Sequence, residues 1–214
     1  FMPGESLAQT PMLGLLLCGR RMPEGWASKA ESVDFFDLKG EIEAVLQAAD
    51  QTVTFRSAVR PGLHDGQTAE VLLGEEVGGV MGRLHPSTAK TLNLPEQTFV
   101  AELELASLMG RALPDYEEIS KFPEVRRDIA VVVNRDTPSA AVLDTARASA
   151  GAALADARIF DVYEGDGVAE NAKSLAIGLT FRDQSRTLTD EEINESLSQV
   201  IESLWEKLGA TLRH

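Results

Sequence analysis

Two arginines stand close together in the segment TFRDQSRTLTDEEI, residues 180–193, which leads into an acidic helix start. Arg182 and Arg186 each carry a planar guanidinium that can bind a phosphate through paired hydrogen bonds. The same geometry also suits a neighbouring carboxylate, in which case the arginine braces a turn. The sequence therefore leaves open a ligand-binding role and a turn-bracing role for this pair.

No arrangement of nucleophile, base or metal ligand stands out elsewhere in the sequence. The glycines of GEEVGGVMG fit neither the dinucleotide-binding nor the phosphate-loop spacing, and we interpret them as hairpin glycines. His64, His85 and His214 have no other His or Cys at metal-ligand spacing, and no nucleophile elbow is present. We therefore expect neither a catalytic residue nor a metal site in this chain.

The composition is that of a folded, soluble protein with one substantial core or two small ones. The chain has 214 residues, 43% of them hydrophobic, and a formal net charge of -14 to which both halves contribute. This charge disfavours generic electrostatic capture of RNA or DNA, so a nucleic-acid contact has to come from a local cluster. Cys18, the single cysteine, is predicted to be buried and indicates a reducing compartment. The apolar runs are too short to span a membrane, and we expect a cytoplasmic protein.

The second half reads as a ferredoxin-like βαββαβ domain. RRDIAVVVN (126–134) alternates as a strand, and Thr137 with Pro138 predicts the start of a helix that runs to near Gly151. ARIFDVYEG and KSLAIGLTFRD are predicted to pair as a hairpin. The spacing of Thr189 and Glu192 predicts a capping box at the start of a long helix that Gly209 ends, before a short strand in ATLR.

Period-two alternation divides the predicted sheet into two faces. The face toward the helices is predicted to carry Ile129, Phe160, Val162, Leu175, Ile177, Leu179 and Phe181. The other face then carries Ala130, Asp161, Tyr163, Ala176, Gly178, Thr180 and Arg182. This second set is mostly small, with one aromatic ring and one arginine, which suits stacking of an unpaired base. It equally suits packing against another domain, with Tyr163 an ordinary cross-strand partner.

The first half is less regular. PMLGLLLCG is predicted as a buried strand, and FFDLKGEIEAVLQAAD as a helix. AEVLLGEEVGGVMGRLHP reads as a hairpin, and TFVAELELASL as another strand. Two prolines and a charged run in residues 112–125 predict a division into units 1–115 and 116–214.

Several blocks carry a family resemblance. SKFPEVRRDIAVVV, FDVYEG and KSLAIGLTFRDQSRTLTDEEI follow one another over residues 120–213. In order and spacing they closely resemble the C-terminal anticodon-binding domain of bacterial phenylalanyl-tRNA synthetase β subunits. VDFFDLKGEIEAVL, RPGLHDGQTAEVLLGEEVGGVMGRLHP and FVAELEL are similar to the end of the catalytic-like module of that subunit. The resemblance implies an α+β chain, in which a partial mixed α/β class II synthetase-like module precedes a ferredoxin-like domain.

The resemblance also implies a function as part of phenylalanine–tRNA ligase. In that family the α subunit holds the active site, uses ATP and Mg²⁺, and charges tRNA(Phe) within an (αβ)₂ assembly. The module resembling residues 1–115 is non-catalytic and assembles with α, and neither class II active-site signature is found in the sequence. The expected partners are therefore tRNA(Phe) and the α subunit, with no DNA, membrane or cofactor bound by this chain.

Within the resembling domain, the family implies RNA contacts for five residues of this sequence. They are Tyr163 for base stacking, Arg182 and Arg186 for phosphate or base contacts, and Lys121 and Arg126 for phosphates. Arg127 and Asp128 suit charged partners that fix the domain, and Asp183 suits holding Arg186 or capping the loop. Two other classes stay open: an assembly module that docks its sheet face on protein, and a ferredoxin-like domain that binds a small regulatory molecule.

Overall fold

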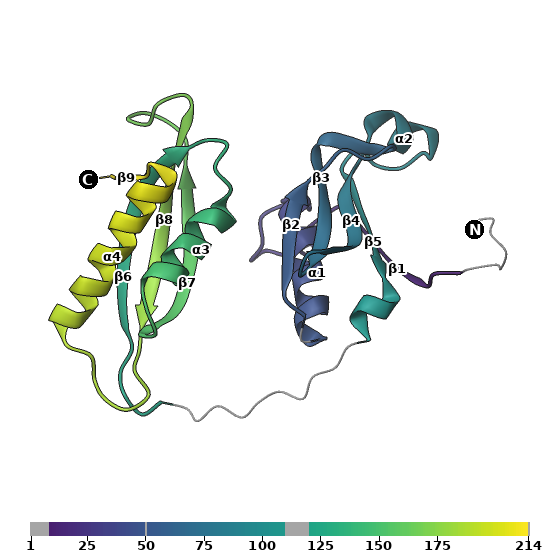
Figure 1. Ribbon diagram of the computed structural model, residues 1–214. Helices are drawn as coiled ribbons and strands as arrows, with labels where there is room; N and C mark the ends of the chain where they lie inside the picture. The colour runs from purple at the N-terminus through teal and green to yellow at the C-terminus, as the bar shows by residue number, and fades with distance from the viewer. Residues whose placement is uncertain (1–8, 50, 110–119, 214) are drawn as a thin grey trace. The chain divides into compact units, whose positions relative to one another are not determined.

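The computed structural model describes residues 9–49, 51–109 and 120–213. The chain forms two compact units, Phe1–Tyr116 and Glu117–His214, called unit 1 and unit 2 below. Each unit has its own antiparallel sheet (Figure 1). Each also has its own hydrophobic core. The α+β fold class predicted from the sequence is confirmed.

Unit 1 is a five-stranded antiparallel sheet in the order β1-β5-β4-β3-β2. Its elements are β1 Met12–Cys18, α1 Phe35–Ala48, β2 Val53–Ser57, β3 Leu63–Leu73, β4 Glu76–Leu84, α2 Pro86–Thr91, β5 Thr98–Glu104 and the 3₁₀ helix η1 Leu105–Leu108. The predicted hairpin is β3 and β4, which turn at Gly74. The strand β2 was not predicted.

Helix α1 packs on one face of this sheet. The Asp34 carboxylate caps it by accepting from the backbone N–H groups of Phe36 and Asp37, and the Asp37 carboxylate accepts from the backbone N–H of Asp34. This capping box fixes where the helix starts, so that Leu38, Ile42 and Leu46 point to the sheet and are buried.

The prediction for PMLGLLLCG was wrong in one respect. The segment forms β1, but β1 is an edge strand whose burial alternates, and both Leu16 and Cys18 are exposed. A continuous apolar run does not reveal whether one or both faces of a strand are covered. Cys18 is therefore an exposed thiol rather than a buried small residue.

Unit 2 has the predicted βαββαβ order. Its elements are β6 Val125–Asn134, α3 Ser139–Ser149, β7 Leu154–Tyr163, β8 Ala172–Phe181, α4 Asp190–Leu208 and β9 Thr211–Leu212. The strands are ordered β7-β8-β6-β9, all antiparallel. Both helices cover the same face of the sheet, which Figure 1 views from the helix side.

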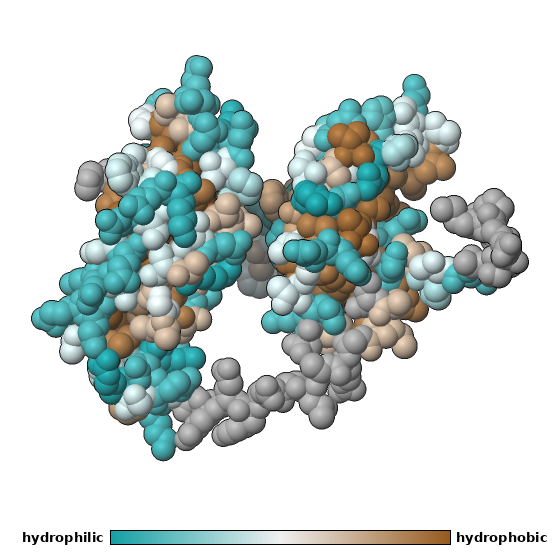
Figure 2. Space-filling model, in the orientation of Figure 1, coloured by the Kyte–Doolittle hydropathy of each residue, from teal (hydrophilic) through white to brown (hydrophobic). Residues whose placement is uncertain are grey.

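The two helices of unit 2 start differently. Helix α4 has the predicted capping box of Thr189 and Glu192, and Gly209 ends it in the left-handed region at φ 63°. Helix α3 follows Pro138, which occupies the N-cap position without a side-chain hydrogen bond. The predicted cap by Thr137 was therefore wrong, because the chain enters the helix one residue later. The outer surface of α4 is largely hydrophilic (Figure 2).

Candidate nucleic-acid interface

The sheet of unit 2 has an outer face, on the side opposite α3 and α4. Strand pairing determines which residues lie on it, because residues directly opposite each other in a ladder point to the same side. Leu175, Ile177 and Leu179 of β8 are buried against the helices, so the alternating residues between them face outward. The centre of the outer face carries small side chains, from Ala130, Ser174, Ala176, Gly178 and Thr180. These residues form a flat floor.

A β-bulge in β7 changes what stands beside this floor. Ile159 lies opposite Ile177 and Asp161 opposite Ala176, so Phe160 is an additional residue without a partner. The bulge lets Phe160 and Asp161 both face outward, and Phe160 is 51% exposed. The prediction that Phe160 faces the helices was wrong, because period-two alternation does not hold across a bulge. Val162 keeps its register opposite buried Leu175 but is 52% exposed on this edge strand.

Phe160 lies under the guanidinium of Arg126. The Arg126 Cζ atom is 5.2 Å from the ring centroid, within the range of a cation–π contact. Arg126 Nε donates to Asp128 Oδ1 at 2.7 Å, which holds the guanidinium in place. Gly178 lies beneath it, since a Cβ at that position would be 2.8 Å from Arg126 Nη2. A glycine is therefore what lets the arginine lie flat on the sheet.

Tyr163 forms a second contact of the same kind, three residues further along β7. The Cζ atom of Arg213 is 4.4 Å from the Tyr163 ring centroid. The Tyr163 hydroxyl donates to the Asp166 carbonyl at 3.2 Å, and the Arg213 backbone N–H donates to the Ala130 carbonyl at 2.8 Å. Sequence reasoning missed Arg213 and Phe160. The position of Arg213 directly after the closing strand could have indicated that it lies beside the sheet. No local feature of the sequence indicates the bulge at Phe160.

Arg182 lies far from Tyr163. Tyr163 is opposite Ser174, and Arg182 follows eight residues later, which at the usual rise of a strand is about 27 Å away. Arg182 Nη1 donates to Glu124 Oε1 at 2.7 Å. Alternation gives the face of a strand residue but not its distance from another residue on that face.

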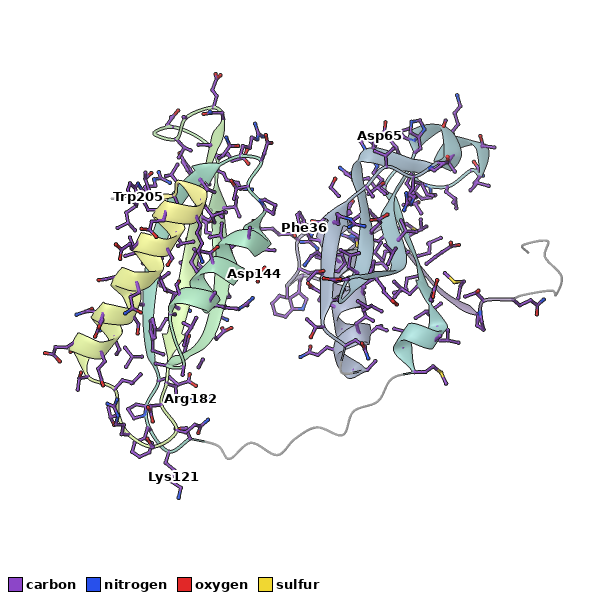
Figure 3. All side chains as sticks on the ribbon, viewed as in Figure 1. Phe36, Asp65, Lys121, Asp144, Arg182 and Trp205 are labelled. Carbon is purple, nitrogen blue, oxygen red and sulfur yellow. The ribbon has the colours of Figure 1, made fainter. Side chains whose placement is uncertain are left out.

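Lys121 lies at the same end of unit 2 as Arg182 (Figure 3). The Ser120 hydroxyl donates to the Asp183 carbonyl at 3.0 Å, which holds this segment beside the loop after β8. Lys121 itself is exposed. The five predicted RNA-contacting residues therefore do not form one cluster: Tyr163 is at one end of the sheet, and Lys121 and Arg182 are at the other.

Arg186 is engaged by the start of α4. Its Nη1 and Nη2 atoms donate to the two carboxylate oxygens of Glu192 at 2.8 and 2.6 Å. These bonds, with the one from the Thr189 backbone, lower the pKa of Glu192 to about 2. Asp183 accepts from the Ser185 hydroxyl and backbone N–H at 2.7 Å each and from the Arg186 backbone at 3.2 Å, which lowers its pKa. This geometry is that of a braced turn.

Arg127 also has a bracing contact, since its Nη2 donates to Asp190 Oδ1 at 2.9 Å. The pair joins β6 to the first turn of α4. An acidic residue there also complements the helix dipole. Arg127 and Asp128 both have a charged partner, as expected. Arg127 pairs with Asp190 of α4, and Asp128 pairs with Arg126 on the outer face.

In unit 1 a buried glutamate and two histidines have structural partners. Glu70 is 8% exposed and binds both Arg56, whose Nε donates at 2.9 Å, and Arg60. The Arg56 hydrogen bond lowers the pKa of Glu70. His64 Nδ1 accepts from the Gly66 backbone, and His85 Nδ1 caps α2. An open pocket of about 510 Å³ lies beside Arg60, lined by Gly14, Leu15, Pro61, Gly62, Leu63, Val80, Leu84, Thr88, Val100, Ala101 and Glu102.

Over residues 9–49, 51–109 and 120–213, no three His, Cys, Asp or Glu side chains are arranged to hold a metal ion. No helix within the same described ranges is long and apolar enough to cross a membrane.

Two known protein families match the chain, and the boundary between the two matches lies where unit 1 ends and unit 2 begins. The ferredoxin-fold anticodon binding domain matches residues 120–213, and the phenylalanyl tRNA synthetase beta chain CLM domain matches residues 2–105. The chain belongs to the phenylalanine–tRNA ligase β-subunit family, matching its C-terminal part. The two matched domains of this family occupy unit 2 and unit 1 respectively.

Relatives in this family cover almost the whole chain. Phenylalanine–tRNA ligase β subunits from Pseudomonas syringae pv. tomato and Hahella chejuensis are 47% and 45% identical, each over 98% of the chain. The β subunit of Methylococcus capsulatus is 41% identical over 97% of it. The chain spans about a quarter of the length of these relatives, 27%, 27% and 26% respectively.

Proposed function

We propose that unit 2 binds the anticodon region of tRNA(Phe), through base stacking on the outer face of its sheet. The observation that carries this proposal is the exposed Tyr163 ring, 38% accessible, beside a floor of small residues in an anticodon-binding domain. An aromatic ring on a flat sheet is the device by which other proteins bind unstacked bases. Tyr163 is the stacking residue of this proposal, and Arg213 over its ring adds positive charge.

The charge of the outer face supports stacking rather than generic attraction to phosphate. Strand pairing puts Arg126 and Arg158 on this face, but it also puts Asp128, Asp156 and Asp161 there. The positive charge of these arginines is therefore offset by the aspartates on the same face. Affinity should depend on the bases presented by a loop more than on the number of phosphates neutralised.

The other predicted contacts have a smaller part in the proposal. Arg126 and Lys121 contact phosphates of the same RNA, and Arg182 lies where the RNA leaves the sheet. Arg186 contributes by bracing the loop, since its guanidinium is bound to Glu192. Removal of Arg186 should therefore reduce stability before it reduces RNA affinity.

Unit 1 packs on the catalytic α subunit in this proposal. The CLM domain match supports a non-catalytic role, and the ion pairs of Arg56 in β2 and Arg60 in the following loop with Glu70 give these two arginines a structural partner. The complete ligase is cytoplasmic, charges tRNA(Phe) with ATP and Mg²⁺ on the α subunit, and assembles as (αβ)₂. Its ATP and Mg²⁺ are assigned to α, and no residue of this chain is assigned to either.

The direct test is binding of the 214-residue chain to tRNA(Phe) and to an unrelated tRNA across a salt series. The proposal predicts tighter binding of tRNA(Phe) at every salt concentration, and a loss of about tenfold for Tyr163→Ala. The matched control is Trp205→Ala, which removes an aromatic that is 61% exposed on α4 and leaves the outer face intact. Equal binding of both tRNAs, weakened only by salt, would contradict the proposal.

The assembly module remains the second candidate, because two arginines of unit 2 brace its own helix α4. Arg127 binds Asp190 and Arg186 binds Glu192. If the outer face docks on protein, Tyr163→Ala should weaken association with the α subunit and leave tRNA binding unchanged. The tRNA series and a pull-down with the α subunit therefore separate the two candidates.

A further inference from the structure

Phe160 lies on the outer face beside the bulge of β7 and is 51% exposed. Ile159 before it lies opposite buried Ile177, and Val162 after it lies opposite buried Leu175, so the bulge lets both Phe160 and Asp161 face outward, on the same side as Tyr163. The ring therefore stays in contact with water, although burial of its apolar area would stabilise the fold. Bulges often re-aim a side chain at a functional surface.

The surroundings of Phe160 hold a guanidinium against the ring. Asp128 orients Arg126, and the absence of a side chain at Gly178 leaves room for the guanidinium on the sheet. Ring and guanidinium are both planar groups on which a base can stack. Phe160 and Arg126 thus repeat the arrangement of Tyr163 and Arg213.

We infer that Phe160, together with Arg126, is a second base-stacking position, so that the outer face takes two unpaired bases of one RNA loop. This inference rests on the proposed function of unit 2. The two rings lie three residues apart on β7, at most about 10 Å along the strand. Four-stranded RNA-binding sheets use such neighbouring aromatics to stack two or three successive bases.

The occupant is a single-stranded loop rather than a duplex. Bases within a duplex are stacked on one another and do not offer a free face to a side chain, whereas loop bases do. The small residues Ala130 and Ala176 between the stacking positions let the RNA backbone approach the sheet. Arg158, which pairs with Gly178 on the same face, lies on the side of Phe160 away from Tyr163, where it can contact a phosphate beside the base on Phe160.

The test measures binding of the 214-residue chain to a synthetic anticodon stem-loop of tRNA(Phe), with 2-aminopurine placed at each loop position in turn. Phe160→Ala and Tyr163→Ala should each weaken binding about tenfold, and the double variant about a hundredfold. Each single variant should also abolish the fluorescence quenching of a different loop position. Phe160→Tyr should keep both affinity and quenching, and Phe160→Leu, which is apolar but has no π face, should lose them.

Control variants keep the outcome interpretable. Trp205→Ala should bind as the unsubstituted chain does, and thermal unfolding should be unchanged for Phe160→Ala because the ring is half exposed. Normal binding by Phe160→Ala together with a tenfold loss for Tyr163→Ala would overturn this inference and leave the proposed function standing. Failure of the unsubstituted chain to bind the stem-loop would overturn both. A Phe160→Ala defect found only in association with the α subunit would assign the ring to a protein interface and also overturn the inference.

Discussion

At the residue scale, Glu192 connects the loop after β8 to helix α4. Its carboxylate accepts a hydrogen bond from the Thr189 backbone N–H at 2.9 Å, which completes the capping box. It also accepts hydrogen bonds from Nη1 and Nη2 of Arg186. The hydrogen bonds from Arg186 and from the Thr189 backbone stabilise the charged carboxylate, and they lower the pKa of Glu192 from its ordinary value of 4.5 to about 2. Protonation of this carboxylate would therefore weaken both the helix start and the contact with the loop arginine.

The lowered pKa predicts a pH dependence of the stability of unit 2. A carboxylate whose pKa is lower in the folded state contributes stability that is present above about pH 4.5 and is lost as the pH falls toward 2. Urea unfolding between pH 6 and 3 should therefore show a steeper loss for the unsubstituted chain than for Glu192→Gln. Trp205 fluorescence, in a Trp26→Phe background, reports unit 2 alone. Identical slopes for the two chains would show that the pair has no such role.

At the element scale, α4 was predictable and β7 was not. The start, apolar stripe and end of α4 depend on residues close together in the sequence, namely Thr189, Glu192 and Gly209. The face of Phe160 depends instead on how β7 pairs with β8, which local periodicity does not record. The floor of the candidate site was therefore predicted correctly from β6 and β8, whereas one of its two aromatic positions was missed.

The capping box makes a prediction for α4. Thr189→Ala removes the acceptor for the Glu192 backbone N–H, and such substitutions cost about 1 kcal/mol. The free energy of unfolding of unit 2, measured by urea with Trp205 fluorescence, should fall by this amount. Thr189→Ser keeps the hydroxyl and should retain most of the stability. If Thr189→Ala is as stable as the unsubstituted chain, the cap observed at Thr189 does not stabilise the helix.

At the scale of the whole molecule, the chain consists of two units with separate cores. Leu38, Ile42 and Leu46 lie in one core, and Leu175 and Leu204 in the other. Each of the two matched family domains corresponds to one of these units. The prolines and the charged run in residues 112–125 predict units 1–115 and 116–214. Which face of each sheet stays open depends on helix packing, which such local signals do not record.

The separation of cores predicts that the proposed RNA site is independent of the core of unit 1. Leu38→Ala leaves a cavity beneath α1 and should destabilise unit 1 by about 2–5 kcal/mol. Affinity for the anticodon stem-loop should stay within twofold of the unsubstituted chain, whereas Leu204→Ala, in the core of unit 2, should lower it at temperatures where that unit begins to unfold. Loss of RNA affinity in Leu38→Ala at temperatures where unit 2 is folded would contradict an RNA site confined to unit 2.

The central claim, that Tyr163 binds the anticodon region and not the reacting groups, is tested most directly in the assembled ligase. Tyr163→Ala should lower the kcat/KM for charging of tRNA(Phe) about tenfold, because one stacked base is lost. Phenylalanine-dependent exchange between ATP and pyrophosphate needs no tRNA and should remain nearly unchanged. An equal loss of both activities would contradict the claim.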